Sequence, residues 1–247
     1  MSTRCALVTG SSGGIGSVIA RTLHDNGWFV IGIDQSADPK TACDAFVTFD
    51  LRQSSDPTRL EKDCMRQVTA ALGERKLSAL INNAATQILG RTDAISAANW
   101  QDTLTVNLTA PLMLSQAFLE DLRSTRGCIL NIGSVHAKAT KPGFVAYATS
   151  KAGLHGMTRA LAIDLGPDVR VLCLAPAAIA TSMLQAGFTG RGDAMERLES
   201  CHPAGRIGSP EAVGRAAAFL LSDNMPFLTG TTFYLDGGVL ARLHDPE

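Results

Sequence analysis

The sequence Cys5-Ala-Leu-Val-Thr-Gly-Ser-Ser-Gly-Gly-Ile-Gly16 joins a short apolar run to a glycine-rich loop. An apolar stripe of Ile15, Ile19 and Leu23 follows at helical spacing, and Gly27 stands where a helix C-terminal cap belongs. Glycine lets a backbone approach a phosphate closely, and the N-terminus of the next helix presents free N–H groups to it. The stretch therefore predicts a strand, a phosphate-binding turn and a helix. A tight strand–helix turn without a ligand is the alternative.

Short apolar runs of strand length alternate with longer amphipathic stretches along the rest of the chain. We expect strands over residues 5–9, 28–34, 77–82, 128–132, 169–175 and 232–235, and long helices over residues 100–122 and 147–165. This alternation predicts the α/β class, with a doubly wound parallel sheet of about seven strands and helices on both faces. Residues 1–247 contain no linker and no repeat, so we expect a single domain.

Composition narrows the classes of protein and partner. The 247 residues include 22 Lys and Arg against 23 Asp and Glu, with no basic stripe, which argues against nucleic acid or an anionic membrane as a partner. No apolar run reaches the roughly 18 residues of a membrane span, and we expect no signal peptide. The six cysteines are scattered, and no His or Cys spacing resembles a metal site. We therefore expect a cytoplasmic protein in a reducing compartment, without a metal.

Residues 182–206 interrupt the alternation of strands and helices. This segment has Gly187, Gly190, Gly192 and Pro203 among scattered apolar residues. It follows the strand expected at residues 169–175, and ligands collect at strand ends in parallel sheets. We expect a partly helical lid over a ligand, with an ordinary long surface loop as the alternative.

Tyr147-Ala-Thr-Ser-Lys151, together with Ser134, forms a second informative pattern. The tyrosine and the lysine are four residues apart and share one face of a helix. An ammonium group beside a phenol favours the phenolate, so we expect the pKa of Tyr147 to fall from about 10 toward working pH. Ser134, at the end of an expected strand, could hold a substrate oxygen. Each residue alone has a structural alternative, but the combination predicts proton transfer.

The second expected strand ends at Asp34. A carboxylate at this point suits hydrogen bonds to both ribose hydroxyls of NAD and repels the 2′-phosphate of NADP. Residues 11–13 and 35–37 contain no Lys or Arg that would neutralise that phosphate. NAD is therefore favoured, while Lys40 lies close enough in sequence to leave NADP open. A turn residue that closes the strand is the structural alternative for Asp34.

These motifs together resemble the short-chain dehydrogenase/reductase family over nearly all of the chain. Thr9-Gly10-x-x-x-Gly14-x-Gly16 is similar to the cofactor loop of that family. Further similar segments are Asp50-Leu51, Asn82-Asn83-Ala84-Ala85, Val106-Asn107-Leu108, Pro176-Ala-Ala-Ile179-Ala-Thr181 and Gly230-Thr-Thr-Phe-Tyr-Leu-Asp236-Gly-Gly. Ala85 and Ala177 stand where the family has glycine, and each adds a methyl group beside the expected cofactor site.

The resemblance implies a Rossmann-like fold that binds a nicotinamide cofactor. The residues that it assigns to cofactor binding are Gly10, Ser12, Gly14, Ile15, Gly16, Asp34, Asp50, Leu51, Asn83, Ala84, Ala85, Tyr147, Lys151, Pro176, Ile179 and Thr181. It also implies a homotetramer, or failing that a homodimer, in which the two long helices contact a partner subunit.

The resemblance also implies a reaction and four catalytic residues. A hydride moves between the nicotinamide and a secondary alcohol or ketone, while Tyr147 gives or takes the proton. Lys151 lowers the pKa of Tyr147 and bonds the nicotinamide ribose, and Ser134 holds the substrate oxygen. Asn107 either binds water or frees a helix carbonyl, which links Lys151 to solvent.

Substrate identity and two other functions stay open. His136 is interpreted first as an exposed loop histidine, and a polar contact to a substrate hydroxyl or carboxylate is the second hypothesis for His136 and for Gln87. An NADP-dependent 3-oxoacyl-thioester reductase would share the four catalytic residues, but Asp34 argues against it. A non-catalytic dinucleotide-binding protein has no need for those four residues together.

Overall fold

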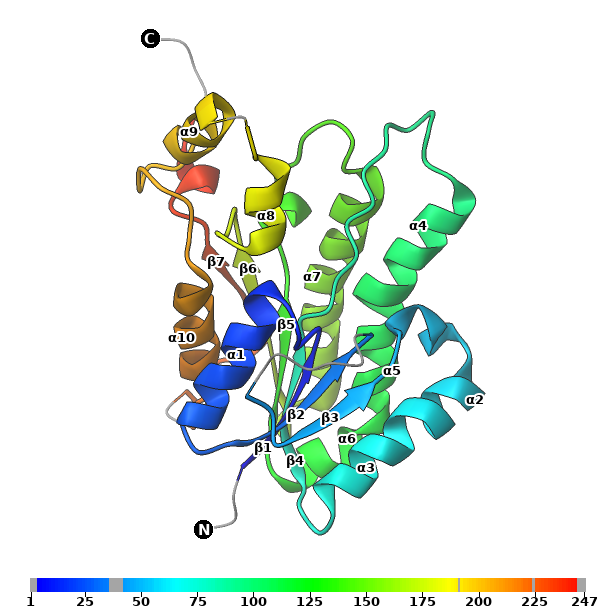
Figure 1. Cartoon of the computed structure of the whole chain (residues 1–247). Helices are drawn as coiled ribbons and strands as arrows, with labels where there is room; N and C mark the ends of the chain where they lie inside the picture. The colour runs from blue at the N-terminus through cyan, green and yellow to red at the C-terminus, as the bar shows by residue number, and fades with distance from the viewer. Residues whose placement is uncertain (1–3, 36–41, 191, 224, 244–247) are drawn as a thin grey trace.

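The chain folds around one parallel sheet, described by a computed structural model for residues 4–35, 42–190, 192–223 and 225–243 (Figure 1). Its seven strands have the order β3-β2-β1-β4-β5-β6-β7, and every neighbouring pair is parallel. The strands are β1 (Cys5–Thr9), β2 (Phe29–Asp34), β3 (Ala45–Thr48), β4 (Leu77–Asn82), β5 (Cys128–Ile132), β6 (Arg170–Pro176) and β7 (Thr232–Leu235). The predicted doubly wound α/β fold is confirmed.

The edge strand β3 was not among the strands expected from the sequence. It has only four residues, and Val47 alone among them is buried. A short strand at the sheet edge has one neighbour and a half-exposed surface, so it lacks the continuous apolar run that marks the central strands. The other six strands begin and end within one residue of the expected bounds.

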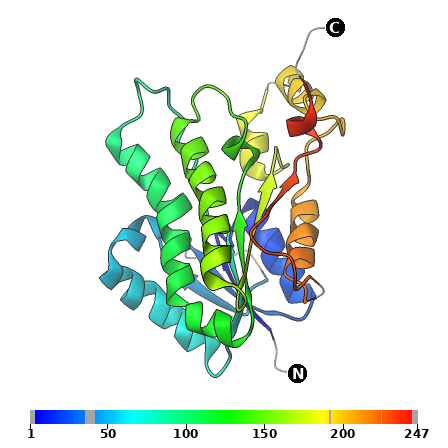
Figure 2. The same cartoon turned by 180° about the vertical axis from the view of Figure 1, so that it is seen from behind.

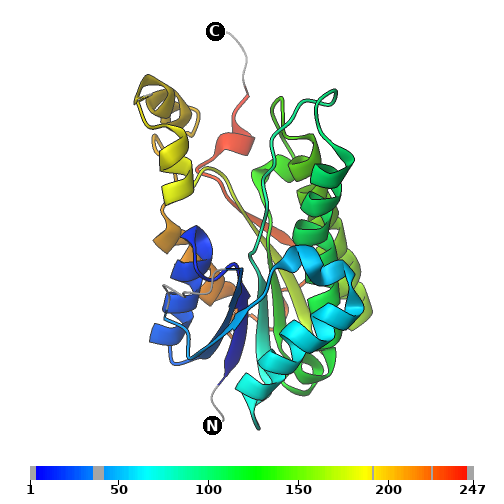
Figure 3. The same ribbon diagram turned by 45° about the vertical axis from the view of Figure 1, so that its right-hand side comes forward.

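Helices cover both faces of the sheet, as Figures 2 and 3 show. On one face α1 (Gly14–Asp25) and α10 (Pro210–Leu220) pack side by side, and their apolar residues share one core with β1, β4, β5 and β6. The helices α3 (Arg66–Leu72), α5 (Ala110–Ala117) and α7 (Val145–Leu165) contribute to the opposite core. The remaining elements are η1 (Leu51–Ser55), α2 (Pro57–Arg59), η2 (Leu60–Met65), α4 (Ala97–Leu104), η3 (Thr105–Thr109), α6 (Leu119–Ser124), η4 (Val135–Ala137), α8 (Ser182–Gly187), α9 (Gly192–Ser200) and η5 (Val239–Ala241).

The prediction of one continuous helix over residues 100–122 is wrong, because the structure divides this segment into α4, η3, α5 and α6. Helix α4 begins one turn earlier, after Ser96, whose hydroxyl accepts the Asn99 N–H. It then widens into the π-helical turn η3, and α5 ends at Phe118 before α6 starts. Pro111 has no N–H to donate to the carbonyl of Asn107, so regular α-helical bonding fails at this point. The helix expected over residues 147–165 is α7, which starts two residues earlier.

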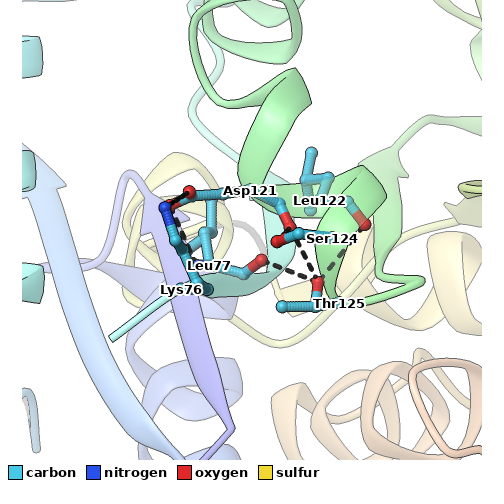
Figure 4. A network of polar contacts seen from close by, with 6 residues as sticks. All are labelled: Lys76, Leu77, Asp121, Leu122, Ser124 and Thr125. Carbon is cyan, nitrogen blue, oxygen red and sulfur yellow. Dashed lines mark hydrogen bonds and ion pairs between the residues drawn. The ribbon is translucent and has the colours of Figure 1, made fainter. Parts of the chain in front are cut away.

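A polar network lies at the end of the sheet where the strands begin (Figure 4). The Asp121 carboxylate accepts the Leu77 N–H at 3.2 Å and pairs with Lys76 at 3.0 Å. The Thr125 hydroxyl lies 3.0 Å from the Leu77 carbonyl. These contacts join the end of α6 to the start of β4.

A cleft of about 940 Å³ opens at this same end of the sheet, and several of its lining residues are cationic. Arg170 donates to the carbonyls of Leu220 and Ser222, just where α10 ends. Arg75 lies over the Phe29 ring, and Arg4 pairs with Asp223. Cations at helix C-termini compensate the negative end of the helix dipole, which accounts for their gathering here. The pocket and catalytic residues singled out from the sequence lie at the opposite end of the sheet, where the strands end.

Candidate active site

The site lies where β1 and β4 end, at the point where the strand order reverses. In doubly wound sheets a crevice forms outside the carboxyl ends of the strands at this place. The Asn83 side-chain amide donates to the carbonyls of Thr9 and Gly10, at 2.9 and 3.2 Å. The Thr9 hydroxyl in turn accepts the backbone N–H groups of Asn83 and Ala84, both at 3.0 Å. These bonds tie the glycine loop to the Asn-Asn-Ala-Ala segment.

The conformation of the glycine loop depends on its glycines. Gly10 and Gly14 have positive φ angles of 66° and 44°, which L side chains rarely adopt. A side-chain carbon on Gly16 would overlap the Gly10 carbonyl oxygen. Across the loop, the Thr181 methyl group comes within 3.1 Å of the position that a Gly14 side chain would occupy. The segment after β6 therefore lies against the glycine loop.

One serine of the glycine loop, Ser12, has a buried hydroxyl that a ligand could satisfy. Among the described residues its Oγ atom has no hydrogen-bond partner, as is also true of Ser11 Oγ, which packs against Gly32 of β2. The Ser12 N–H donates to the Asp34 carboxylate at 3.0 Å, so the acidic group at the end of β2 lies beside the loop. The Ser12 hydroxyl, an open helix N-terminus and an adjacent carboxylate fit the phosphates and the ribose of a nicotinamide dinucleotide.

A pocket of about 120 Å³ lies deeper in the crevice, at the ends of β5 and β6. It brings together seven residues that were expected at the cofactor or catalytic site: Ile15, Asn83, Ala85, Ser134, Tyr147, Lys151 and Pro176. The other lining residues are Ile132, Gly133 and Ala177. Ile132 and Gly133 were missed from the sequence because an apolar residue and a glycine at a strand end carry no chemical signal.

Lys151 is buried, with 2% of its surface exposed, beneath this pocket. Its ammonium group donates to the Ile132 carbonyl at 2.7 Å and lies 5.8 Å from the centre of the Tyr147 ring. Burial lowers the pKa of Lys151 to about 8, against a small opposing effect of Cys173. The amine therefore loses its proton near pH 8, well below the pH at which an exposed lysine does.

The pKa of Tyr147 does not move in the expected direction. Burial raises it above 10, although a hydrogen bond with Ser134 partly opposes that effect. The expectation rested on a strong ammonium–phenol interaction. In the structure the phenol loses its solvation, and the ammonium is directed to the Ile132 carbonyl. Ser134 lies next to Tyr147, as the sequence spacing suggested.

Asn107 is fully buried within the π-helical turn, and its side chain is bonded to protein atoms. Its Oδ1 accepts the Thr86 N–H at 2.8 Å, and its Nδ2 donates to the Thr86 carbonyl at 3.0 Å and to Ser150 Oγ at 2.9 Å. Ser150 Oγ donates to the carbonyl of Tyr147 at 2.7 Å. Pro111 cannot donate to the Asn107 carbonyl, so this carbonyl lacks its α-helical donor, and both expected roles of Asn107 stay predictions.

His136 lies beside Tyr147, in contact with residues that sequence reasoning missed. Its ring stacks on Phe144 with centroids 4.3 Å apart, and it lies edge-on to Tyr147 at 5.9 Å. Nδ1 lies 2.9 Å from Thr140 Oγ1. The partners are distant enough in sequence that only the fold joins them. Gln87 is exposed, and no hydrogen bond to it is found in the part of the chain that the structure describes.

The other expected cofactor residues do not line this pocket. The Asp50 carboxylate is engaged with Arg52, which lies 2.7 Å away and lowers the pKa of that carboxyl. Leu51 and Ile179 are buried, and Thr181 caps α8 by accepting the Leu184 N–H at 3.2 Å. The segment 182–206 contains α8 and α9, so its partly helical character is present. Ser36, Ala37 and Lys40 lie outside the described residues.

Neither a metal site nor a membrane-crossing helix is found among the described residues. No group of three or more His, Cys, Asp or Glu side chains is arranged to hold a metal ion there. None of the helices in those same ranges combines the length and the apolar character that crossing a membrane requires.

Comparison with known proteins identifies the class. A family model described as enoyl-(acyl carrier protein) reductase matches residues 10–240. Among relatives, the chain is 34% identical to a 3-oxoacyl-(acyl-carrier-protein) reductase of Haemophilus influenzae, over 97% of this chain and 99% of the relative. It is 30% identical to the NAD-dependent glycerol dehydrogenase of Listeria innocua, over 95% of this chain and 93% of the relative.

A solved structure agrees with these sequence matches. The ligand-free aldohexose dehydrogenase of Thermoplasma acidophilum superimposes with a TM-score of 0.91 and 29% identity, over 99% of this chain and 97% of that chain. The chain therefore belongs to the short-chain dehydrogenase/reductase family, whose members are oxidoreductases that use a nicotinamide dinucleotide.

Proposed function

We propose that this protein is an NAD-dependent oxidoreductase that transfers a hydride between nicotinamide and a secondary alcohol or ketone. The observation that carries the proposal is the pocket in which Ser134, Tyr147 and Lys151 meet, at the end of the sheet that also bears the glycine loop. A hydroxyl, a phenol and a buried amine around one small space suit proton transfer to or from a substrate oxygen.

A preference for NAD is supported by the contact between Asp34 and the glycine loop. The Asp34 carboxylate accepts the Ser12 N–H, so its charge lies beside the backbone that would hold the cofactor phosphates. A 2′-phosphate would meet this carboxylate at close range, whereas ribose hydroxyls can donate to it. Arg52 lies near, 3.4 Å from the Gln35 side chain, but its charge is paired with Asp50.

The roles of the three pocket residues follow from their positions. Bound NAD would accept the hydride from the alcohol carbon, or NADH would donate it to the ketone carbon. Tyr147 takes the proton of the alcohol oxygen during oxidation and returns it during reduction. Ser134 donates a hydrogen bond to the same oxygen and stabilises its developing negative charge. The protonated amine of Lys151, 5.8 Å from the centre of the Tyr147 ring, would favour the phenolate and so oppose the burial that raises the pKa of this phenol.

Proton exchange with solvent is assigned to the Asn107 segment. The π-helical turn and Pro111 leave the Asn107 carbonyl without a regular helical donor, and the side chain holds the segment through Thr86 and Ser150. A water on that carbonyl would extend the path from Lys151. The helical segment 182–206 is proposed as the lid over the substrate.

Assembly into a homotetramer, or failing that a homodimer, is part of the proposal. Helix α7 leaves Ile163 82% exposed, and Phe219 on α10 is 54% exposed. Large apolar side chains at the surface suit burial against another subunit. Sedimentation at several concentrations distinguishes a tetramer, a dimer and a monomer.

The activity is tested with a panel of secondary alcohols and ketones, followed by the absorbance of reduced nicotinamide. Turnover with NAD or NADH that is lost in Ser134→Ala supports the proposal. Dinucleotide binding without turnover over the whole panel would contradict it and favour a non-catalytic binding protein.

A 3-oxoacyl-thioester reductase that uses NADP is a second candidate. The 34% identity with the 3-oxoacyl-(acyl-carrier-protein) reductase of Haemophilus influenzae favours it, and the same pocket residues would serve that reaction. Asp34 argues against NADP. Reduction of an acetoacetyl thioester with NADPH, faster than any alcohol is oxidised with NAD, would replace the first candidate with this one.

A further inference from the structure

The imidazole of His136 is held in a fixed position next to Tyr147. Its ring is nearly parallel to Phe144, at 3° between planes, and Tyr147 is edge-on to both rings. Its backbone N–H donates to Ser134 Oγ at 3.1 Å, so one turn carries both side chains. A ring held by stacking, by a hydrogen bond and by its own backbone has little conformational freedom. Ordering a side chain in this way costs conformational entropy, which is expected where its position serves binding.

The second ring nitrogen of His136 is available to a ligand. Nδ1 is engaged with Thr140 Oγ1 at 2.9 Å, and the two ring nitrogens point away from each other. Within the described residues, Nε2 makes no hydrogen bond. The turn that carries Ser134 thus brings a further polar atom of the protein close to the Tyr147 ring, whose centroid lies 5.9 Å from that of His136.

The charge state of His136 selects the kind of group that Nε2 can bind. Burial, and secondarily the charge of Lys141, lower the pKa of this histidine below 6.5, so the ring is neutral at physiological pH. In the neutral ring, Nε2 accepts a hydrogen bond if Nδ1 carries the hydrogen and donates to Thr140 Oγ1. It donates a hydrogen bond if Nδ1 instead accepts from the Thr140 hydroxyl. A hydroxyl group can meet either tautomer, because it both donates and accepts. A carboxylate requires a donor and gains most from an imidazolium, which this site disfavours.

We propose, on the basis of the function given above, that the substrate carries a second hydroxyl next to the reacting carbon and that His136 Nε2 hydrogen-bonds to it. The substrate class is then vicinal diols and the corresponding α-hydroxyketones, which includes polyols and sugars. The reacting alcohol gives a hydride to NAD and a proton to Tyr147, and the C–O bond becomes a carbonyl. The second hydroxyl is unchanged and serves recognition only.

The simplest alternative is that His136 only packs on Phe144. A phenylalanine would do this equally well, so His136→Phe separates the two roles. This variant retains a flat ring against Phe144 and removes both nitrogens. Thr140→Val is a gentler second variant, since it leaves the histidine in place and removes the partner of Nδ1.

The experiment compares kcat/KM for butane-2,3-diol and butan-2-ol with NAD, in the wild type, both variants and His24→Phe. His24 is a half-exposed histidine at the end of α1, remote from the pocket, and serves as the matched control. We expect the wild type and the control to prefer the diol by about 10- to 100-fold, because butan-2-ol leaves the His136 nitrogen without a hydrogen-bond partner. In His136→Phe this ratio falls to about one, and in Thr140→Val it falls by an intermediate factor.

Each contrary outcome has a separate meaning. Equal use of the two alcohols by the wild type overturns the diol assignment, as does a ratio that survives in His136→Phe. Preference for lactate over butane-2,3-diol would also overturn it, in favour of an anionic substrate bound near Lys138 and Lys141. Absence of turnover with every alcohol and ketone would instead overturn the proposed function itself. Circular dichroism of each variant checks that the fold is retained.

Discussion

The Lys151 ammonium group donates a 2.7 Å hydrogen bond to the carbonyl of Ile132, the last residue of β5. Ser134 follows two residues later, so one strand end fixes both the amine and the hydroxyl of the site. The bond also explains why a fully buried lysine is tolerated, since its charge has at least one acceptor. Burial nevertheless lowers the pKa of this amine to about 8.

Replacing Lys151 with methionine should stabilise the protein and abolish activity. Below pH 8 both the folded and the unfolded chain carry the proton, so the folded state bears the full burial penalty. As pH rises from 8 to 10.5, the folded state loses the proton first, and wild-type stability increases. We expect Lys151→Met to gain on the order of 1–3 kcal/mol at pH 7 and to lose this advantage toward pH 10.5.

Denaturant unfolding at several pH values, without cofactor, measures this difference. Lys138→Met, at an exposed lysine, is the control and should change stability little at any pH. A Lys151→Met protein that is less stable than the wild type at pH 7 would show that the Ile132 bond outweighs the burial penalty.

Asn107→Ala should destabilise the fold as well as slow the reaction. It removes three hydrogen bonds of a fully buried side chain and leaves both backbone groups of Thr86 without this partner. We expect a loss of roughly 2–4 kcal/mol and a decrease in kcat, because the helical turn beside Lys151 relaxes. Asn99→Ala, on the preceding helix α4, is the control. Equal stability of the two variants would contradict the assigned structural role.

Gly133→Ala should disturb Ser134 through the residues behind the strand. A side-chain carbon at this position would overlap the His155 ring and lie 2.6 Å from the sulfur of Cys173. Both neighbours are buried, so the strand end must shift, at a cost of roughly 1–3 kcal/mol, and kcat should fall with it.

The double variant Gly133→Ala/His155→Ala tests the cause of this effect. Removing the His155 ring makes room for the new methyl group. His155→Ala should therefore lower the free energy of unfolding less in the Gly133→Ala background than in the wild type. Gly156→Ala on α7, whose nearest neighbour is an Arg159 atom 3.9 Å away, should be neutral or stabilising. Additive costs of the two substitutions would mean that the His155 contact does not set the position of Ser134.

Cofactor choice should depend on Asp34. We expect wild-type kcat/KM to be at least about 100-fold higher with NAD than with NADP, since the like charges of a 2′-phosphate and the Asp34 carboxylate would repel each other at a cost of several kcal/mol. Asp34→Asn should reduce the ratio by improving use of NADP. Asp25→Asn, at an exposed carboxylate at the end of α1, should leave it unchanged. Equal use of both cofactors by the wild type would refute the assignment.

Much of the fold could be read from the sequence because the central strands are buried on both faces. Continuous apolar runs such as those of β1 and β5 have no other common explanation. The short edge strand β3 has no such run. The break at Asn107 depends on Pro111 and on buried partners such as Thr86, which a helical pattern alone does not reveal.

The site was predictable where residues of defined chemistry stand at fixed spacing. Tyr147, Lys151 and Ser134 meet as their spacing suggests. The direction of the Tyr147 pKa was wrong, because it depends on how far the fold buries the phenol. The contacts of His136 with Phe144 and Thr140 also required the folded loop.

The most direct test of the proposed mechanism is turnover by Tyr147→Phe. The substitution removes one oxygen atom and retains the ring. We expect kcat for alcohol oxidation to fall by roughly 10²- to 10⁴-fold, the range that general acid–base catalysis supplies, while NADH still binds, as followed by its fluorescence. Full activity of Tyr147→Phe, with the same alcohol and NAD, would contradict the central claim that this phenol transfers the proton.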